Sequence, residues 1–508
     1  MGELQQCGAL VSPPSVALHA TAAAGVTVFT IVSRELFIDR FMAGITGTVT
    51  DHSQALQRLL RNGVMTAAQL MERLGISQPT LSRTIQRLHA AVTTFRIKGD
   101  RTPRYALLRE LPLGLQPRQR VYRVLRSGSI EPFADLEFLH GGGTLERRGT
   151  ASVLYPGLPP YLRLAAPAGY LGREVAVAAA REQRFPASLA DWHDDHRAAW
   201  LLTRGFNLAG NLVFGDLSLQ LDMDWRTVPP TPVGQRAEHY AALATAATVG
   251  AHGAGLGGDQ PKFLALVEGP GHVLVKFARR GSRMAELLPL EHLALRELAR
   301  AGVPASATEL LTTQDHVFLE VQRFDRVGRH GRIGLLSAGA VDDEFFGRRD
   351  TWSEFAARCE QARTLRADQA RHIDTLAAFS ELIGNNDRHF ENIALLIGED
   401  GDYAGLAPAY DILPMRYASL GGGVDPALLP ITPKVGTIGA RPDVWGRAWQ
   451  AAERFWQAAQ TEALPAPLSA EMRQLAAVNL EVARAFVAPL LPAVGELPAR
   501  AVAGRRGR

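Results

Sequence analysis

The chain has little cysteine and little lysine. Its 508 residues contain two cysteines, Cys7 and Cys359, which cannot form a disulfide framework or a cysteine-rich zinc site. We therefore expect a reducing, cytoplasmic location. The chain has 55 basic residues, and almost all of them are arginine. Where arginine is the default, a lysine marks a position that favours a compact point charge. The lysines are Lys98, Lys262, Lys276 and Lys434.

Long apolar runs are also missing. Residues 15–33 are mildly apolar, but they contain His19 and several threonines, and no basic segment precedes them. This pattern argues against a signal peptide and a membrane span, so we expect no membrane partner. We expect residues 1–50 to be an N-terminal extension. An alternative is that translation starts at Met42 and that residues 1–41 lie upstream of the natural protein.

The remaining composition is that of a folded protein with several domains. Apolar residues make up 46% of the chain and charged residues 21%, which excludes a disordered chain and a coiled-coil rod. No period of 20 to 50 residues repeats, which excludes solenoids and propellers. A length of 508 residues exceeds what one hydrophobic core usually serves. The sequence therefore predicts an α+β multidomain protein.

Positive charge is concentrated in one segment. Residues 51–110 contain ten arginines and lysines and four acidic residues, a net charge of +6, whereas the whole chain carries +4. The other residues together therefore carry −2. A small basic module beside a nearly neutral body suggests that the module has a polyanionic partner.

The same segment has the pattern of a winged helix-turn-helix. Leucines at 56, 59 and 60 predict a first helix that ends at Asn62-Gly63. Thr66 is the expected N-cap of a second helix over 67–74, which Gly75 closes. Ser77 opens a third helix with Leu81, Ile85 and Leu88 on its inner face. Residues 93–97 and 104–108 predict a hairpin wing.

In this interpretation the third helix enters the major groove of double-stranded DNA. Its first residues and Arg83, one turn on, face the bases, and Arg87 and the basic residues of the wing face phosphates. The alternative is a protein-interaction module with solvated arginines. The expected DNA-binding residues are Ser77, Gln78, Thr80, Arg83, Arg87, Arg96 and Lys98.

Two segments towards the middle of the chain suggest phosphate binding. Residues 250–262 (GAHGAGLGGDQPK) contain five glycines, which let backbone N–H groups approach phosphate oxygens. A flexible turn is the alternative. Lys276 then lies within an apolar strand, where a lysine needs a partner. The following helix over 284–300 offers Glu286, Glu291 and Glu297, as in the strand-lysine and helix-glutamate pairs of kinases.

A third segment predicts a catalytic loop. In IGNNDRHFENI the carboxylate of Asp387 and the amide of Asn392 are five positions apart, as in kinases, where the aspartate acts on the acceptor hydroxyl and the asparagine holds magnesium. A strand, a polar turn and Asp411 follow. Hard oxygen ligands such as Asn392 and Asp411 suit Mg²⁺. We expect His389 to stabilise the loop beside the nucleotide.

These segments resemble the HipA-like serine/threonine kinases, which are toxins of bacterial toxin–antitoxin systems. The resemblance covers about residues 150–490, and the fused N-terminal module with YPGLPPYL and GNLVFGD is similar to the YjjJ subgroup. It implies a two-lobed protein-kinase-like fold, ATP with Mg²⁺, and a possible antitoxin. The motifs that carry it are GDQPK (258–262), VK (275–276), RFDR (323–326), NDRHFEN (386–392) and YDIL (410–413).

By residue matching, Asp387 is catalytic, Asn392 and Asp411 hold the metal, and Glu291 is the partner of Lys276. The resemblance places the adenine hinge at 322–324. The expected cofactor-binding residues are Gly257, Gly258, Gln260, Lys262, Lys276, Glu291, Gln322, Phe324 and His389. Two positions depart from the family pattern. Gly255 stands where a serine is often autophosphorylated, so that route of self-inactivation is in doubt, and Gln322 replaces a frequent glutamate.

The expected domains are 51–110 for the DNA-binding module, 111–235 for a HipA-like N-terminal subdomain, 236–325 for the kinase N-lobe, 326–495 for a mainly helical C-lobe and 496–508 for a basic tail. The favoured function is an ATP- and Mg²⁺-dependent serine/threonine protein kinase that phosphorylates a cellular protein and autoregulates transcription through its own DNA-binding domain. One alternative is a nucleotide-sensing transcription regulator without turnover. Another is a small-molecule kinase.

Overall fold

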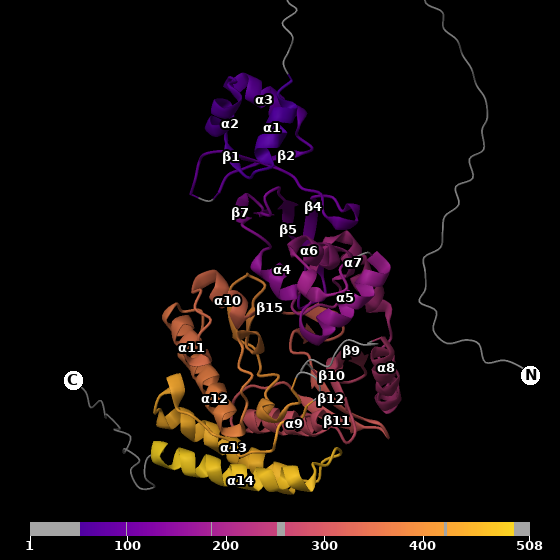
Figure 1. Ribbon diagram of the computed structural model, residues 1–508, viewed down its shortest axis with the longest axis vertical. Coiled ribbons are helices and arrows are strands. Elements are labelled where there is room, and N and C mark those ends of the chain that lie inside the picture. The colour runs from indigo at the N-terminus through magenta and orange to yellow at the C-terminus, as the bar shows by residue number, and fades with distance from the viewer. Residues whose placement is uncertain (1–50, 98, 184, 251–259, 421–423, 492–508) are drawn as a thin grey trace, which may run out of the picture. The chain divides into compact units, whose positions relative to one another are not determined.

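The computed structural model describes residues 51–97, 99–183, 185–250, 260–420 and 424–491 (Figure 1). Several predictions concern residues outside these ranges. They are the N-terminal extension 1–50, Lys98 in the wing, the loop residues Gly255, Gly257 and Gly258, and the tail 496–508.

The N-terminal domain is a winged helix-turn-helix, as the sequence predicts. Three helices precede a small antiparallel sheet of order β1-β3-β2. The leucines at 56, 60, 70 and 81 are fully buried in its core. Strand β1, between the first two helices, is an element that the sequence pattern did not predict. The elements are α1 (Ser53–Leu60), β1 (Met65–Thr66), α2 (Ala67–Leu74), α3 (Gln78–Arg87), β2 (Val92–Phe95) and β3 (Arg104–Leu107).

Local sequence signals set the ends of α2. The Thr66 hydroxyl accepts from the Gln69 backbone N–H at 3.4 Å, and the Gln69 side chain accepts from the Thr66 N–H at 2.9 Å, which is a capping box. Gly75 ends the helix with φ of +64°, a conformation that glycine adopts at low cost. The turn into α3 is thereby fixed by the sequence.

The next part of the chain is built on a five-stranded antiparallel sheet of order β7-β6-β5-β4-β8. Helices pack on it through a core that includes Phe138, Leu162 and Phe214. The strands are β4 (Arg118–Val124), β5 (Ile130–Phe138), β6 (Thr144–Arg148), β7 (Ala151–Tyr155) and β8 (Leu212–Phe214). The helices are α4 (Pro160–Ala165), α5 (Gly169–Gln183), α6 (Asp194–Arg204) and α7 (Gly215–Thr227).

A separate core joins this sheet to the wing. Phe95 and Leu108 pack with Leu139 and Leu145, so the hydrophobic core crosses the boundary expected at residue 110. A buried polar contact accompanies it, in which the Thr93 hydroxyl donates to Glu137 at 2.5 Å. Hydrophobic packing and a satisfied buried polar pair together favour a fixed attachment of the DNA-binding module to this sheet.

The site region contains a four-stranded antiparallel sheet of order β11-β12-β10-β9. Helix α9 (Arg283–Arg300) packs against it and buries leucines at 287, 288, 290 and 293. This arrangement of a small sheet and one helix is that of a kinase N-lobe. The strands are β9 (Lys262–Val267), β10 (Gly271–Arg279), β11 (Thr308–Thr312) and β12 (His316–Gln322), and helix α8 (Arg236–Gly250) precedes them.

The C-terminal part is mainly helical, as predicted. Figure 1 shows α13 and α14 lying along one another with α12 running towards them at an angle, and Trp445, Phe455 and Trp456 are fully buried in the core of this part. The helices are α10 (Ala338–Phe345), α11 (Trp352–Gln361), α12 (Ala367–Ile383), α13 (Pro442–Thr461) and α14 (Ala470–Val487). The strands are β13 (Arg326–Val327), β14 (Gly331–Arg332), β15 (Gly334–Ser337), β16 (Ala394–Ile397) and β17 (Tyr403–Leu406). Within the ranges described above, no helix is both long and apolar enough for a membrane span.

Candidate active site

The side chain of Lys276 lies at the centre of the candidate site. It projects from β10, which is paired with β9 and β12 on either side. Its Nζ atom donates to both carboxylate oxygens of Glu291 on α9, at 2.7 and 2.6 Å, and to Oδ1 of Asp411 at 2.5 Å. Lys276 and Glu291 are almost completely buried. Of the three helix glutamates that the sequence offered, the structure thus selects Glu291.

The charged groups of this site change one another's pKa values. Burial alone would lower the pKa of Lys276, but the carboxylates of Asp411 and Glu291 outweigh it and raise that pKa. Burial raises the pKa of Glu291, against the opposing effect of Lys276. For Asp411, burial is outweighed by Lys276 and Lys262, which lower its pKa to about 2. At neutral pH the site therefore holds a charged lysine beside an ionised Asp411.

Backbone geometry fixes Asp411. Its φ is +58°, a left-handed conformation that a residue with a side chain adopts only when its surroundings enforce it. The approach to it is anchored by Ala409, whose N–H donates to Pro304 and whose carbonyl accepts from Ser306. Strain of this kind is typical of functional positions.

The predicted catalytic loop follows α12. Gly384 ends that helix with φ of +76°, and an added Cβ there would meet Ile431 at 2.9 Å. In the loop, the Asn392 side-chain amide donates to the carbonyl of Asp387 at 3.0 Å, and the Asp387 N–H donates to Asn385 at 3.1 Å. The Asp387 carboxylate is 42% exposed, which leaves it accessible to an acceptor hydroxyl.

His389 lies beside Asp387, with its Nε2 atom 3.6 Å from Oδ1 of the aspartate. Its Nδ1 atom is 3.3 Å from Glu391, which raises the pKa of His389. Arg349 donates to the same glutamate at 2.6 Å. Glu391 and Arg349 were not among the predicted site residues. Glu391 stands inside the NDRHFEN motif, whereas Arg349 is 42 positions earlier in a loop, where the sequence gives no signal.

The expected adenine hinge, residues 322–324, begins at the end of β12. Gln322 ends β12, and its side chain is exposed and donates to the Pro270 carbonyl at 3.3 Å. Its backbone N–H donates to Ala307. The Phe324 ring packs against the Tyr410 ring at a tilt of 34°, with ring centroids 5.6 Å apart. Both donor groups of Gln322 thus contact protein atoms, and its role in adenine binding stays a prediction, as does that of Phe324.

The described end of the glycine loop adjoins Lys276. Gln260 is buried, and its Nε2 atom has no hydrogen-bond partner among the described residues. Lys262 is the register partner of Lys276 across β9 and β10. Lys262 also lowers the pKa of both Asp411 and Glu291, so it adds positive charge to the same site.

The donor set fits a magnesium ion that is bound together with a nucleotide. Asn392 uses its amide nitrogen for Asp387, which directs its Oδ1 atom elsewhere, and Asp411 uses Oδ1 for Lys276. With respect to the described residues, this leaves Oδ1 of Asn392 and Oδ2 of Asp411 for a hard cation. Mg²⁺ is typically held by one or two carboxylates and by substrate phosphates. In the described part of the chain, no group of three or more His, Cys, Asp or Glu residues is placed to hold a metal ion by itself.

The predicted DNA-binding residues that the structure describes lie at the protein surface. Ser77, Gln78, Arg83 and Arg87 are exposed on α3, and Thr80 is half-buried. Arg96 is exposed after β2 and donates to the Arg101 carbonyl at 3.1 Å. The Ser77 and Thr80 hydroxyls are 3.1 Å apart, so the N-terminus of α3 presents polar groups outward.

The chain matches three protein families in succession. Residues 43–91 match the MarR family, residues 115–223 the YjjJ-like toxin middle domain, and residues 254–484 the HipA-like C-terminal domain. The chain is 32% identical over 417 residues to Toxin YjjJ of Escherichia coli strain K12, which covers 79% of this chain and 91% of that protein. The chain belongs to the YjjJ toxin family.

Solved structures provide more distant likenesses. HipA from Shewanella oneidensis MR-1, solved with HipB and operator DNA, is 16% identical, with a TM-score of 0.40, and the match covers 68% of this chain and 94% of that one. The Helicobacter pylori proinflammatory kinase CtkA is 12% identical, with a TM-score of 0.32 and coverage of 44% and 90%. Membership in the YjjJ family agrees with the resemblance that the motifs indicated.

Proposed function

We propose that this YjjJ-family protein is an ATP- and Mg²⁺-dependent serine/threonine protein kinase. The observation that carries the proposal is that Lys276 on a strand is hydrogen-bonded both to Glu291 on a helix and to Asp411 in a distant loop. A buried strand lysine bonded to a helix glutamate is the phosphate-binding arrangement of protein kinases. The proximity of the Asp387 and Asn392 loop also supports the proposal, because the hydroxyl of Tyr410, next to Asp411, donates to the Glu391 carbonyl of that loop at 2.7 Å.

In this mechanism Lys276 and the glycine loop bind the phosphates of ATP. Asn392 and Asp411 would hold magnesium, which supplies charge neutralisation between the phosphates when bound. Asp387 accepts the proton of the substrate hydroxyl and orients its oxygen for in-line attack. Asn392 positions Asp387 through its hydrogen bond to the Asp387 carbonyl. Glu291 keeps the Lys276 ammonium fixed and charged.

We also propose that the N-terminal domain binds double-stranded DNA. The support is its MarR-type fold, its net positive charge and the exposed polar start of α3. Autoregulation of transcription would follow if the bound site lies in its own operon. A separate antitoxin is proposed from family membership, because HipA-like toxins normally pair with a separate antitoxin.

Transfer of labelled phosphate from Mg-ATP into a cell lysate tests the kinase proposal. The purified full chain is expected to label at least one protein band in a reaction that EDTA stops. Label found only in the small-molecule fraction would identify a small-molecule kinase. ATP binding without any transfer would instead indicate a nucleotide-sensing regulator.

A further inference from the structure

A small cavity between α7 and the strands β9, β10 and β14 collects unpaired buried nitrogen atoms. Its volume is about 10 Å³, which is room for about one water-sized particle before any side chain moves. Six of its lining side chains each have a buried nitrogen without a hydrogen-bond partner among the described residues. These nitrogens belong to Trp225, Arg226, His272, Arg326, His330 and Arg332.

Most of these atoms are donors that cannot also accept. The indole N–H of Trp225 and the guanidinium N–H groups of Arg226, Arg326 and Arg332 have no lone pair for hydrogen bonding. Buried donors without acceptors are costly, and native structures contain few of them. Four such donors at one cavity therefore point to an acceptor with several lone pairs.

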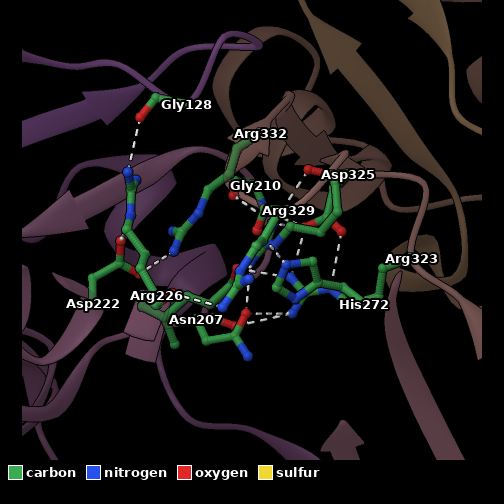
Figure 2. Close-up of polar contacts among 12 residues, drawn as sticks. Gly128, Asn207, Gly210, Asp222, Arg226, His272, Arg323, Asp325, Arg329 and Arg332 are labelled. Atoms are coloured by element: carbon green, nitrogen blue, oxygen red, sulfur yellow. Dashed lines mark hydrogen bonds and ion pairs between the residues drawn. The ribbon is translucent and has the colours of Figure 1, made fainter. Parts of the chain in front are cut away.

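The charge at the cavity is positive. Asp222 contacts Arg332 and also accepts from Arg226 at 3.3 Å (Figure 2). Asp325 accepts from Arg323 and Arg326, at 2.8 and 2.7 Å. The two aspartates therefore face four arginines, and a further arginine, Arg329, lines the cavity.

The positive charge is also poorly solvated. The side chains of Arg326 and Arg332 are 3% and 5% exposed. Burial and the neighbouring arginines lower the pKa of both. Because arginine stays protonated in proteins, this unfavourable environment is relieved by a negative charge rather than by loss of a proton.

We infer that this cavity is a binding site for a small inorganic anion, such as chloride or phosphate. Chloride is slightly larger than a water molecule and requires small shifts of the lining side chains, whereas a phosphate requires a larger outward movement of the exposed Arg329 side chain. The cavity is distinct from the Lys276, Asp387 and Asp411 group, none of which lines it. It adjoins the expected hinge, because the Arg323 N–H donates to the His272 carbonyl at 3.0 Å.

The anion would stabilise a junction between two parts of the chain. On one side of the junction Arg226 on α7 donates to Gly128 at 2.8 Å, and across it Arg329 donates to the Val228 carbonyl at 3.2 Å. The Gly210 N–H donates to Asp325 at 2.8 Å (Figure 2). An anion bonded to arginines from α7 and from β14 adds a further link across the same junction.

The thermal unfolding midpoint of the full chain tests this inference. Sodium gluconate is replaced stepwise by chloride, phosphate or sulfate at constant ionic strength and pH, without nucleotide. A saturable rise in the midpoint with chloride or with an oxyanion supports the site and identifies which anion it prefers. Midpoints that are equal in all salts overturn the inference and leave a neutral water as the acceptor.

Two variants test whether the anion-dependent rise in the unfolding midpoint comes from this cavity. Arg332→Gln is expected to weaken the apparent anion affinity about ten-fold or more, because a charge-assisted hydrogen bond is lost. Trp225→Phe removes one N–H with little change in shape and is expected to weaken it several-fold. Arg236→Gln and Trp192→Phe are the controls, since these buried side chains are paired elsewhere. An unchanged anion response in both cavity variants would overturn the assignment.

Discussion

Lys276 and Asp411 are 135 positions apart in the sequence, yet Nζ of the lysine lies 2.5 Å from Oδ1 of the aspartate. The contact joins a strand of the small sheet to a loop of the mainly helical part. Both residues carry charge at neutral pH, and both are required near the phosphates of a bound nucleotide in the proposed mechanism. Nucleotide binding is thus expected to compete for, and rearrange, this ion pair.

The first prediction concerns Glu291. Replacing it with glutamine leaves Asp411 as the only carboxylate bonded to the Lys276 ammonium, and the lysine then competes with magnesium for the Asp411 carboxylate. We expect an ATP affinity lower by about ten-fold and a free energy of unfolding lower by about 3 kcal/mol, as for other broken buried ion pairs. Calorimetric titration with Mg-ATP and urea unfolding measure the two effects.

The control for this variant is Glu286→Gln on the same helix. Glu286 is partly exposed and contacts Arg283 and the Ser469 N–H, away from Lys276. It should change ATP affinity little. Equal losses of ATP affinity in the two variants would contradict the role of Glu291.

The second prediction concerns the DNA-binding module. The double substitution Arg83→Ala and Arg87→Ala removes two exposed charges from α3. Because Arg87 is expected to contact a phosphate and Arg83 a base, the slope of log affinity against log salt should become shallower by about 1, with weaker binding at all salt concentrations. Fluorescence anisotropy with duplex DNA measures both.

Arg447→Ala is the control for loss of positive charge, because this exposed arginine lies on α13 in the C-terminal part of the chain. The DNA affinity and salt slope of this variant should equal those of the unmodified chain. Unchanged DNA binding in the double variant would favour the protein-interaction alternative for the module.

The third prediction concerns Asp325. Burial alone would raise the pKa of this carboxyl, but Arg323 and Arg326 outweigh it and hold the pKa below its usual value. A carboxyl whose pKa is lower in the folded than in the unfolded chain stabilises the fold at pH values above the unfolded-chain pKa of about 3.9. That stabilisation is lost as the pH falls towards the pKa of the folded chain. Asp325→Asn should lower the free energy of unfolding by about 3–5 kcal/mol at pH 7.

The pH dependence separates this effect from a packing defect. The stability gap between the unmodified chain and Asp325→Asn should be constant from pH 7 to about pH 5 and should narrow below about pH 4. Urea unfolding at a series of pH values measures the gap. A gap that stays constant down to pH 3 would show that the charge of Asp325 is not its source.

Much of the fold could be predicted from local signals. Thr66, Gly75 and the leucine spacing defined the helices of the N-terminal module, because caps and periodicity act within a few residues. Strand β1 was missed because two residues carry no periodic pattern. The wing strand β2 ends at Phe95, two residues before the predicted end at Ile97.

The parts of the candidate site that depend on tertiary contacts could not be predicted from the sequence alone. The strand lysine and the Asp387 and Asn392 spacing were visible because each lies within one motif. The choice of Glu291 among three glutamates could be made only by matching to a known family, since helix periodicity does not fix which turn faces the sheet. The contact of Arg349 with Glu391 was missed because it joins two loops 42 positions apart.

The most direct test of the kinase proposal compares Asp387→Asn with Asp402→Asn in the labelled-phosphate assay. Asp402 is an exposed turn residue that follows the catalytic loop, so its variant controls for the loss of one nearby carboxylate. ATP binding is measured for both chains by calorimetric titration. We expect Asp387→Asn to retain ATP binding and to transfer phosphate to protein at least 100-fold more slowly (~10²–10⁴ for a general base), whereas Asp402→Asn transfers at the normal rate. Equal transfer by the two variants, or no transfer by the unmodified chain despite ATP binding, would contradict the account.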